Sequence, residues 1–232
     1  MRMKNPNINS NQLKILALVC MTLDHIGLIL LPQYTFLRVI GRLAFPIFAW
    51  MIAEGCRHTR NMGKYLVSIT VVGVLYQLEF TLLIHSLKMN IMLTFAMSVG
   101  LCWLLKAARE KGSKLLSLLV PVCLVAVYVL TDILPLFVPR GYGIDYGFYG
   151  VLLPVALYLA KDKKQQLLAA GVFLILLAIW SKWPVQLASL LALPLLAMYN
   201  GQRGNRKLKW LFYIYFPAHL TVLWMLYFLL RK

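Results

Sequence analysis

Apolar runs of about twenty residues, separated by short polar loops, make up most of this sequence. A run of that length spans the hydrocarbon core of a bilayer as an α-helix. The chain has 232 residues, of which 61% are hydrophobic and 13% are charged, too few charges to cover a soluble domain. Because the loops leave no room for a second domain, we expect residues 1–232 to form one all-α transmembrane helical bundle.

Nine helical spans are predicted from the positions of these runs. Their ranges are 13–31, 35–53, 64–84, 90–107, 115–138, 146–160, 164–181, 184–199 and 209–230. The first run contains Asp24 and His25 and lacks a small-residue cleavage site, which favours a retained span over a cleaved signal peptide. The four cysteines have no metal-ligand spacing, so no metal site is predicted.

The formal net charge of +17 would suit a nucleic-acid partner, but the positions of the charges argue against one. Of the 24 Lys and Arg residues, two lie within the second predicted span, and five lie on one side: Lys88, Arg140, Lys182, Arg231 and Lys232. The other seventeen lie in the alternate loops. Basic residues concentrate on the cytoplasmic side of a membrane protein, so we expect the N-terminus inside and the C-terminus outside. We expect the protein to be a multi-pass protein of a cell membrane, the bacterial cytoplasmic membrane.

Asp24 and His25 are costly residues for an apolar span. They lie eleven and twelve residues into the first run, roughly 17 Å deep at 1.5 Å per residue. An ionisable group at that depth costs roughly 3 kcal/mol or more, so it is normally paired, faces a cavity or serves function. Either Asp24 anchors a cation while His25 acts as a general base, or the pair only locks helix packing.

Arg38 and Arg42 are spaced i, i+4 and therefore share one face of the second span. The first two spans run antiparallel through a short turn, so Arg42 is expected near the level of Asp24. An Arg–carboxylate bond would satisfy both charges, which leaves Arg42 as either structural or catalytic. Arg38 is expected nearer the outer interface, where it either reaches outward or lines an external substrate pocket.

Three further segments carry polar or helix-breaking residues. Pro46 is expected to kink the second span. The segment 54–61 after it is dense in donors suited to phosphate groups, and it also fits an ordinary basic loop on the cytoplasmic side. Asp145 lies at an outer span boundary, where a turn or helix cap is typical. In the last span, Pro217 is expected to open the helix near His219, whose depth resembles that of His25 and indicates a shared polar cavity.

The segments that carry these features follow one another in a distinctive order. They are Leu13-Lys14-Ile15, Met21-Thr22-Leu23-Asp24-His25-Ile26-Gly27, Arg38, Gly41-Arg42-Leu43-Ala44-Phe45-Pro46-Ile47-Phe48, Glu54-Gly55, Thr59-Arg60-Asn61, Lys64-Tyr65, Asn90-Ile91-Met92, Thr94, Asp145-Tyr146-Gly147, Asn200-Gly201, Arg203-Gly204, Phe212-Tyr213, Tyr215, Pro217 and His219-Leu220. This combination resembles the TraX family of membrane acetyltransferases over nearly the whole chain. The segment Gln77-Leu78-Glu79-Phe80 departs from the family pattern, which has a proline before the Phe, and leaves the role of Glu79 open.

The resemblance implies an acyl-CoA-dependent acetyltransferase. Such an enzyme moves an acetyl group from cytoplasmic acetyl-CoA to an amine or hydroxyl of a membrane-associated acceptor, a pilin-like peptide N-terminus or a cell-surface glycan. Acyl transfer needs a base, donors for the developing oxyanion and cations for the CoA phosphates. The implied catalytic residues are His25, Asp24, His219 and Arg42, with the two histidines as alternative bases. The implied CoA contacts are Arg57, Arg60, Asn61, Lys64 and Arg203, and the implied acceptor-site residues are Arg38, Asn90, Tyr215 and Asp145.

Two other functions fit the same residues. A proton-coupled transporter would use Asp24, His25 and Glu79 as a relay, although the lack of a convincing internal repeat weakens it. A non-catalytic assembly component for a surface structure would use the buried charges only to lock helix packing. Binding of CoA by the purified protein separates the acetyltransferase from both.

Overall fold

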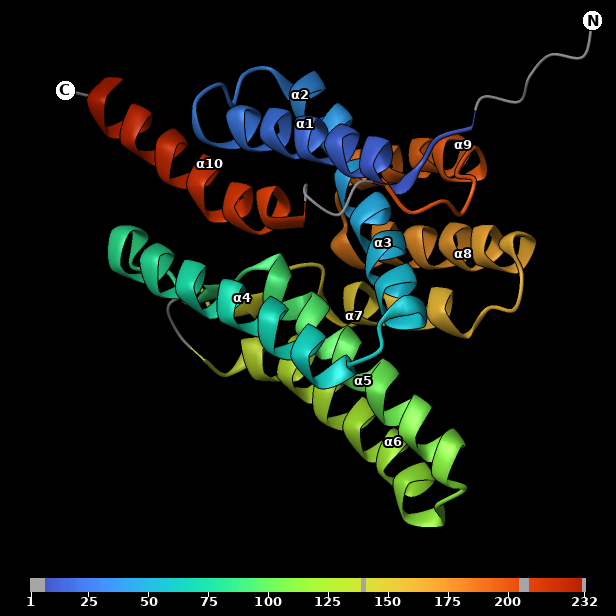
Figure 1. Ribbon diagram of the computed structural model, residues 1–232. Helices are drawn as coiled ribbons and strands as arrows, with labels where there is room; N and C mark the ends of the chain where they lie inside the picture. The colour runs from blue at the N-terminus through green and yellow to red at the C-terminus, as the bar shows by residue number, and fades with distance from the viewer. Residues whose placement is uncertain (1–6, 139–140, 205–208, 231–232) are drawn as a thin grey trace, which may run out of the picture. The chain divides into compact units, whose positions relative to one another are not determined.

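The computed structural model describes residues 7–138, 141–204 and 209–230, and most of them are helical (Figure 1). The elements are α1 (Ser10–Ile29), α2 (Thr35–Gly41), α3 (Ala44–His58), α4 (Met62–Ile84), β1 (Lys88–Met89), α5 (Ile91–Lys111), α6 (Lys114–Tyr128), η1 (Val129–Ile133), η2 (Leu134–Leu136), β2 (Gly143–Ile144), α7 (Gly147–Leu159), α8 (Lys163–Ser181), η3 (Pro184–Leu191), α9 (Ala192–Ala197) and α10 (Lys209–Leu230). The two short strands pair in parallel. The expected all-α class is confirmed.

Six helices within the described ranges are long and apolar enough to cross a membrane, which makes this a multi-pass membrane protein. Three shorter apolar segments, Gly147–Leu159, Pro184–Ala197 and Ile214–Leu230, coincide with the sixth, eighth and ninth predicted spans. The count of nine and the orientation stay predictions. Seven of the basic residues that set the orientation lie outside the described residues: Arg2, Lys4, Arg140, Arg206, Lys207, Arg231 and Lys232.

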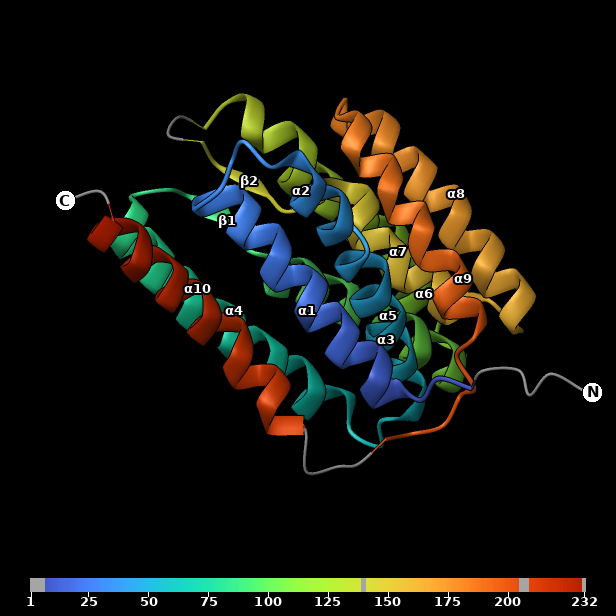
Figure 2. The same ribbon diagram turned by 90° about the horizontal axis from the view of Figure 1, so that it is seen from above.

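One compact unit of the chain runs up to Met51 and resumes at Asp162. In it, α1 contacts α2 along one side and α10 along another (Figure 2). The start of α1 is held by the backbone after α9, because Ile8 N–H donates to the carbonyl of Met198 at 3.1 Å and Ser10 N–H to that of Gln202 at 3.1 Å. Asn9 caps the helix and forms a capping box with Gln12. These bonds fix the first turn of α1 against the segment that follows α9.

The predicted second span is divided into α2 and α3. Helix α2 ends at Gly41 and α3 begins at Ala44, so Pro46 lies in the first turn of α3. Proline cannot donate to the carbonyl four residues back, here that of Arg42, and its ring clashes with that group. The expected kink is therefore a break just ahead of Pro46. Helix α10, by contrast, continues through Pro217 without interruption.

The second compact unit comprises Ile52–Lys161. Helix α5 is at its centre, with α4, α6 and α7 packed against it (Figure 1). Small hydroxyl side chains of α5 bind the backbone of the α7 region, since Thr94 donates to the carbonyl of Asp145 and Ser98 to that of Val151, each at 2.8 Å. These bonds satisfy buried hydroxyls that lipid could not solvate.

Helices α1 and α2 approach each other closely at two glycines. A Cβ atom at Gly41 would lie 2.2 Å from Oδ1 of Asp24, and one at Gly27 would lie 2.8 Å from Cβ of Leu37. Neither position accepts a larger side chain without displacing its neighbour. At Gly41 the displaced neighbour would be the carboxylate of Asp24.

Gly41→Ala is expected to destabilise the protein by about 1–3 kcal/mol, the usual cost of forcing extra atoms into a packed interior. The measurement is thermal unfolding of the purified protein in detergent or lipid nanodiscs. Gly100→Ala on α5 is the matched control, because a Cβ there meets nothing within 4 Å. Equal unfolding temperatures for the two variants would contradict the close contact at Gly41.

Candidate functional site

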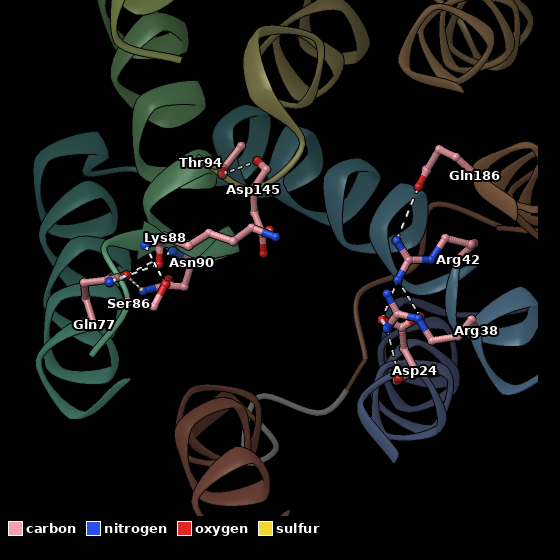
Figure 3. Close-up of polar contacts among 10 residues, drawn as sticks. All are labelled: Asp24, Arg38, Arg42, Gln77, Ser86, Lys88, Asn90, Thr94, Asp145 and Gln186. Carbon is pink, nitrogen blue, oxygen red and sulfur yellow. Dashed lines mark hydrogen bonds and ion pairs between the residues drawn. The ribbon is translucent and has the colours of Figure 1, made fainter. Parts of the chain in front are cut away.

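The first polar cluster joins α1, α2 and η3 and consists of Asp24, Arg38, Arg42 and Gln186; we call it the arginine cluster (Figure 3). The carboxylate of Asp24 accepts from Nη1 of Arg38 at 2.5 Å and from Nη2 of Arg42 at 2.5 Å. Nη1 of Arg42 also donates to Oε1 of Gln186 at 3.3 Å. The structure thus brings Asp24 to both arginines of the second predicted span, where sequence reasoning paired it with Arg42.

Sequence reasoning missed two residues at this site, Trp183 and Gln186. Trp183 covers both guanidinium groups, with the Cζ atoms of Arg38 and Arg42 each 5.2 Å from its ring centroid. Gln186 is 2% exposed, and its one local signal is that it is a polar residue within an apolar stretch.

The arginine cluster carries a net positive charge. Two guanidinium groups surround one carboxylate, and Asp24 and Asp162 are the two acidic residues of this unit among the seven of the chain. Asp162 is engaged elsewhere, where it caps α8 by accepting from the N–H of Gln165 at 2.8 Å. Nε2 of Gln186 is buried and has no hydrogen-bond partner in the described part of the chain. The cluster therefore offers positive charge and a buried donor to a developing anion.

The second polar cluster joins α1 to α10 and contains His25 and His219; we call it the histidine pair. Nδ1 of His25 lies 2.9 Å from Nε2 of His219, a hydrogen-bond distance. Nδ1 of His219 lies 2.8 Å from the carbonyl oxygen of Tyr215, and the Tyr215 ring stacks on His219 with centroids 5.2 Å apart. The carboxylate of Asp24 is bonded to the arginines and not to His25. The partner of His25 is therefore the other histidine.

The hydroxyl of Tyr215 is used within the same interface. It lies 2.7 Å from Oγ1 of Thr22, and Thr22 donates its own proton to the carbonyl of Leu18 at 2.8 Å. Because Thr22 has one proton to give, the proton between the two hydroxyls belongs to Tyr215. Tyr215 thus ties α10 to α1 one turn before His25.

Asn90 and Asp145 lie together in the second compact unit (Figure 3). Asn90 caps α5 by accepting from the N–H of Met92 at 3.0 Å, and its amide donates to the carbonyl of Gly73 at 2.8 Å. Asp145 forms an ion pair with Lys88 at 3.1 Å, beside the ladder of β1 and β2. In this structure both side chains hold neighbouring elements together.

The predicted CoA contacts differ in how they are engaged. Nη2 of Arg57 donates to the carbonyls of Leu157, Tyr158 and Ala160, the last at 2.6 Å, so Arg57 caps the C-terminus of α7. Asn61 caps α4 by accepting from the N–H of Lys64 at 2.8 Å.

The side chains of Arg60 and Lys64 are exposed and can reach a phosphate group. Arg203 is also exposed, in the other compact unit, on the segment whose backbone holds the start of α1.

Comparison with known proteins gives three findings. A family model described as "TraX protein" matches residues 9–227. The chain is 27% identical over 250 residues to a protein named "Probable fimbrial assembly protein FimC, serogroup H1" from Dichelobacter nodosus, with 95% of this chain and 96% of the relative covered. It is 30% identical over 156 residues to an uncharacterized protein of Rickettsia prowazekii (strain Madrid E), covering 67% of this chain and 57% of that protein. No solved structure matches.

Asp24→Asn is expected to cost about 3–5 kcal/mol of stability, because it leaves two buried guanidinium groups without their counter-charge. Asp162→Asn makes the same chemical change at a helix cap, where Asn serves equally well, and should cost less than about 0.5 kcal/mol. Thermal unfolding of both variants tests this difference. If Asp24→Asn unfolds at the wild-type temperature, Asp24 does not anchor the arginines.

Arg57→Ala is expected to destabilise the protein by about 1–3 kcal/mol, since it uncaps the carbonyls at the end of α7. Arg60→Ala, three residues away and exposed, should change stability by less than about 0.5 kcal/mol. The two variants are compared by chemical denaturation in the same detergent. Equal losses would show that the cap on α7 contributes nothing measurable.

Proposed function

Because the chain belongs to the TraX family, whose model matches residues 9–227, we propose that it is a membrane-embedded acetyltransferase. The family assignment confirms the resemblance seen in the sequence, and that resemblance implies acetyl transfer from cytoplasmic acetyl-CoA to an amine or hydroxyl of a membrane-associated acceptor. The observation that carries the proposal is the histidine pair, two imidazoles in hydrogen-bond contact within apolar helices.

The histidine pair supplies the base that acyl transfer requires. A neutral imidazole can take the proton of the acceptor N–H or O–H as its nitrogen or oxygen attacks the thioester. Ionisable residues inside a span are costly and commonly mark functional sites. These two histidines satisfy each other without a carboxylate. A neutral imidazole has one ring nitrogen with a lone pair, and that nitrogen can accept a proton.

The arginine cluster supports the same chemistry. Its surplus positive charge and the buried amide of Gln186 suit the negative charge that develops on the thioester oxygen. Within this proposal Asp24 is the anchor that holds Arg38 and Arg42, with Arg42 the candidate for the oxyanion and Arg38 for the acceptor. The exposed cations Arg60 and Lys64 are the candidates for the CoA phosphates.

A second candidate function is a non-catalytic role in assembling a surface fibre. The printed name of the Dichelobacter nodosus relative, a probable fimbrial assembly protein, favours it. The same name also favours a pilin-like peptide over a glycan as the acceptor of the acetyltransferase. Under the assembly role, the histidine pair and the arginine cluster serve only to lock the helices.

The test uses the full chain in lipid nanodiscs, deuterated acetyl-CoA and cell envelopes from a strain that lacks the gene. Mass spectrometry of envelope peptides and glycans should detect deuterated acetyl groups with the wild-type protein. His25→Ala should reduce transfer at least about 100-fold, the usual contribution of a general base. His85→Ala, at an exposed helix end, should leave transfer unchanged.

Each alternative predicts a different result. Undiminished transfer by folded His25→Ala protein would remove His25 from catalysis. No CoA binding and no transfer by folded wild-type protein, together with fimbriation restored by the His25→Ala gene, would replace the acetyltransferase with the assembly role.

A further inference from the structure

The hydrogen bonds around the histidine pair determine which ring nitrogens carry protons. A carbonyl oxygen only accepts, so the 2.8 Å contact with Tyr215 O places a proton on Nδ1 of His219. In the neutral imidazole, Nε2 of His219 then holds a lone pair and must accept. Its partner at 2.9 Å, Nδ1 of His25, is therefore the donor. This leaves the lone pair of neutral His25 on Nε2.

We infer that Nε2 of His25 is the basic atom of the site, and that His219 is the positioning residue that holds His25 in this tautomer. Both ring nitrogens of His219 are engaged, one by a carbonyl and one by His25. Nδ1 of His25 is engaged as well, which leaves Nε2 as the ring nitrogen of the pair that can receive a proton from an acceptor. The choice between the two histidines, open at the level of sequence, is made by one backbone carbonyl.

The surroundings of His219 fix its ring in the orientation that this role needs. The Tyr215 ring lies nearly parallel to it, at an interplanar angle of 9°, and Phe216 contacts it edge-on with centroids 6.0 Å apart. The hydroxyl of Tyr215 donates to Thr22, three residues before His25 on α1. This second bond between α1 and α10 sets the register in which the two imidazoles meet.

The acetyl-transfer step in which His25 would act rests on the proposed function. The nitrogen or oxygen of the acceptor attacks the acetyl carbonyl carbon as its proton passes to Nε2 of His25. The new C–N or C–O bond forms and the C–S bond breaks. The proton then passes from Nε2 to the leaving sulfur, which yields free CoA thiol and neutral His25.

His219 also stabilises the imidazolium that forms during this step. Protonated His25 still donates from Nδ1 to His219, and His219 still donates to the carbonyl of Tyr215, so the chain of hydrogen bonds polarises toward the new charge. The logic is that of a triad in which a third group orients the base, with a neutral imidazole in the place of a carboxylate.

The tautomers can be measured directly by solid-state 15N NMR of the full chain in lipid bilayers. Histidine labelling in a His58→Gln/His85→Gln background leaves His25 and His219 as the labelled residues. At about pH 8.5, well above the ordinary pKa of histidine, both should be neutral with Nδ1 protonated and Nε2 unprotonated. An Nε2-protonated His25 in this otherwise wild-type protein overturns the inference, and this measurement needs no variant of the pair.

Acetyl transfer by His219 variants provides the second readout. His219→Gln can keep an acceptor for Nδ1–H of His25, and should keep the tautomer and transfer within about 10-fold of wild type. His219→Phe removes the acceptor and should lower transfer at least about 100-fold while the protein stays folded.

Equal transfer by the two folded variants would overturn the positioning role. If NMR finds the inferred tautomers but the wild-type protein transfers no acetyl group, the assignment of the protons is supported and the acetyltransferase proposal is overturned.

Discussion

The carboxylate of Asp24 holds the first two predicted spans together. It accepts hydrogen bonds from both Arg38 and Arg42, and breaking such a buried pair by removing one partner typically costs about 3–5 kcal/mol. The local packing depends on this contact. A side chain at Gly41 would collide with the carboxylate of Asp24. The break ahead of Pro46 separates α2, which carries Arg38, from α3, and Arg42 lies at the junction. Trp183 and Gln186 then cover the guanidinium groups.

The contact between α1 and α10 has a different chemistry from the contact between α1 and α2. It is made by neutral groups: two imidazoles, two hydroxyls and a backbone carbonyl. Adjacent residues of a helix diverge by about 100°, so Asp24 can face the arginines while His25 faces α10. The ion pairs and the histidine contact are thus made by neighbouring residues on different faces of one helix. Across this contact the partner of His25 is His219.

Several basic residues near the helix ends have structural partners. Arg57 donates to the last carbonyls of α7, and Lys163 donates to the carbonyls of Ala197 and Tyr199 at the end of α9. A cation at a helix C-terminus satisfies carbonyls that have no partner within the helix and interacts favourably with the helix dipole. A basic loop in the sequence is therefore a weaker signal for phosphate binding than its charge suggests. The exposed cations Arg60 and Lys64 are the better candidates.

The sequence by itself determined the features that depend on local pattern. Hydropathy and run length predicted a helical membrane protein, the order of segments indicated the TraX family, and the short turn between the first two spans predicted that Asp24 lies near Arg42. Only the tertiary structure decided which distant faces meet. Similar depth in the sequence indicated that His25 and His219 share polar surroundings, and the structure shows that these residues, 194 positions apart, are in direct hydrogen-bond contact. Gln186 reaches Arg42 from 144 positions away. The position of a residue within its apolar run gives its depth along the helix, but it does not specify which neighbour that residue faces, because rotation and pairing of helices are set by packing over the whole unit.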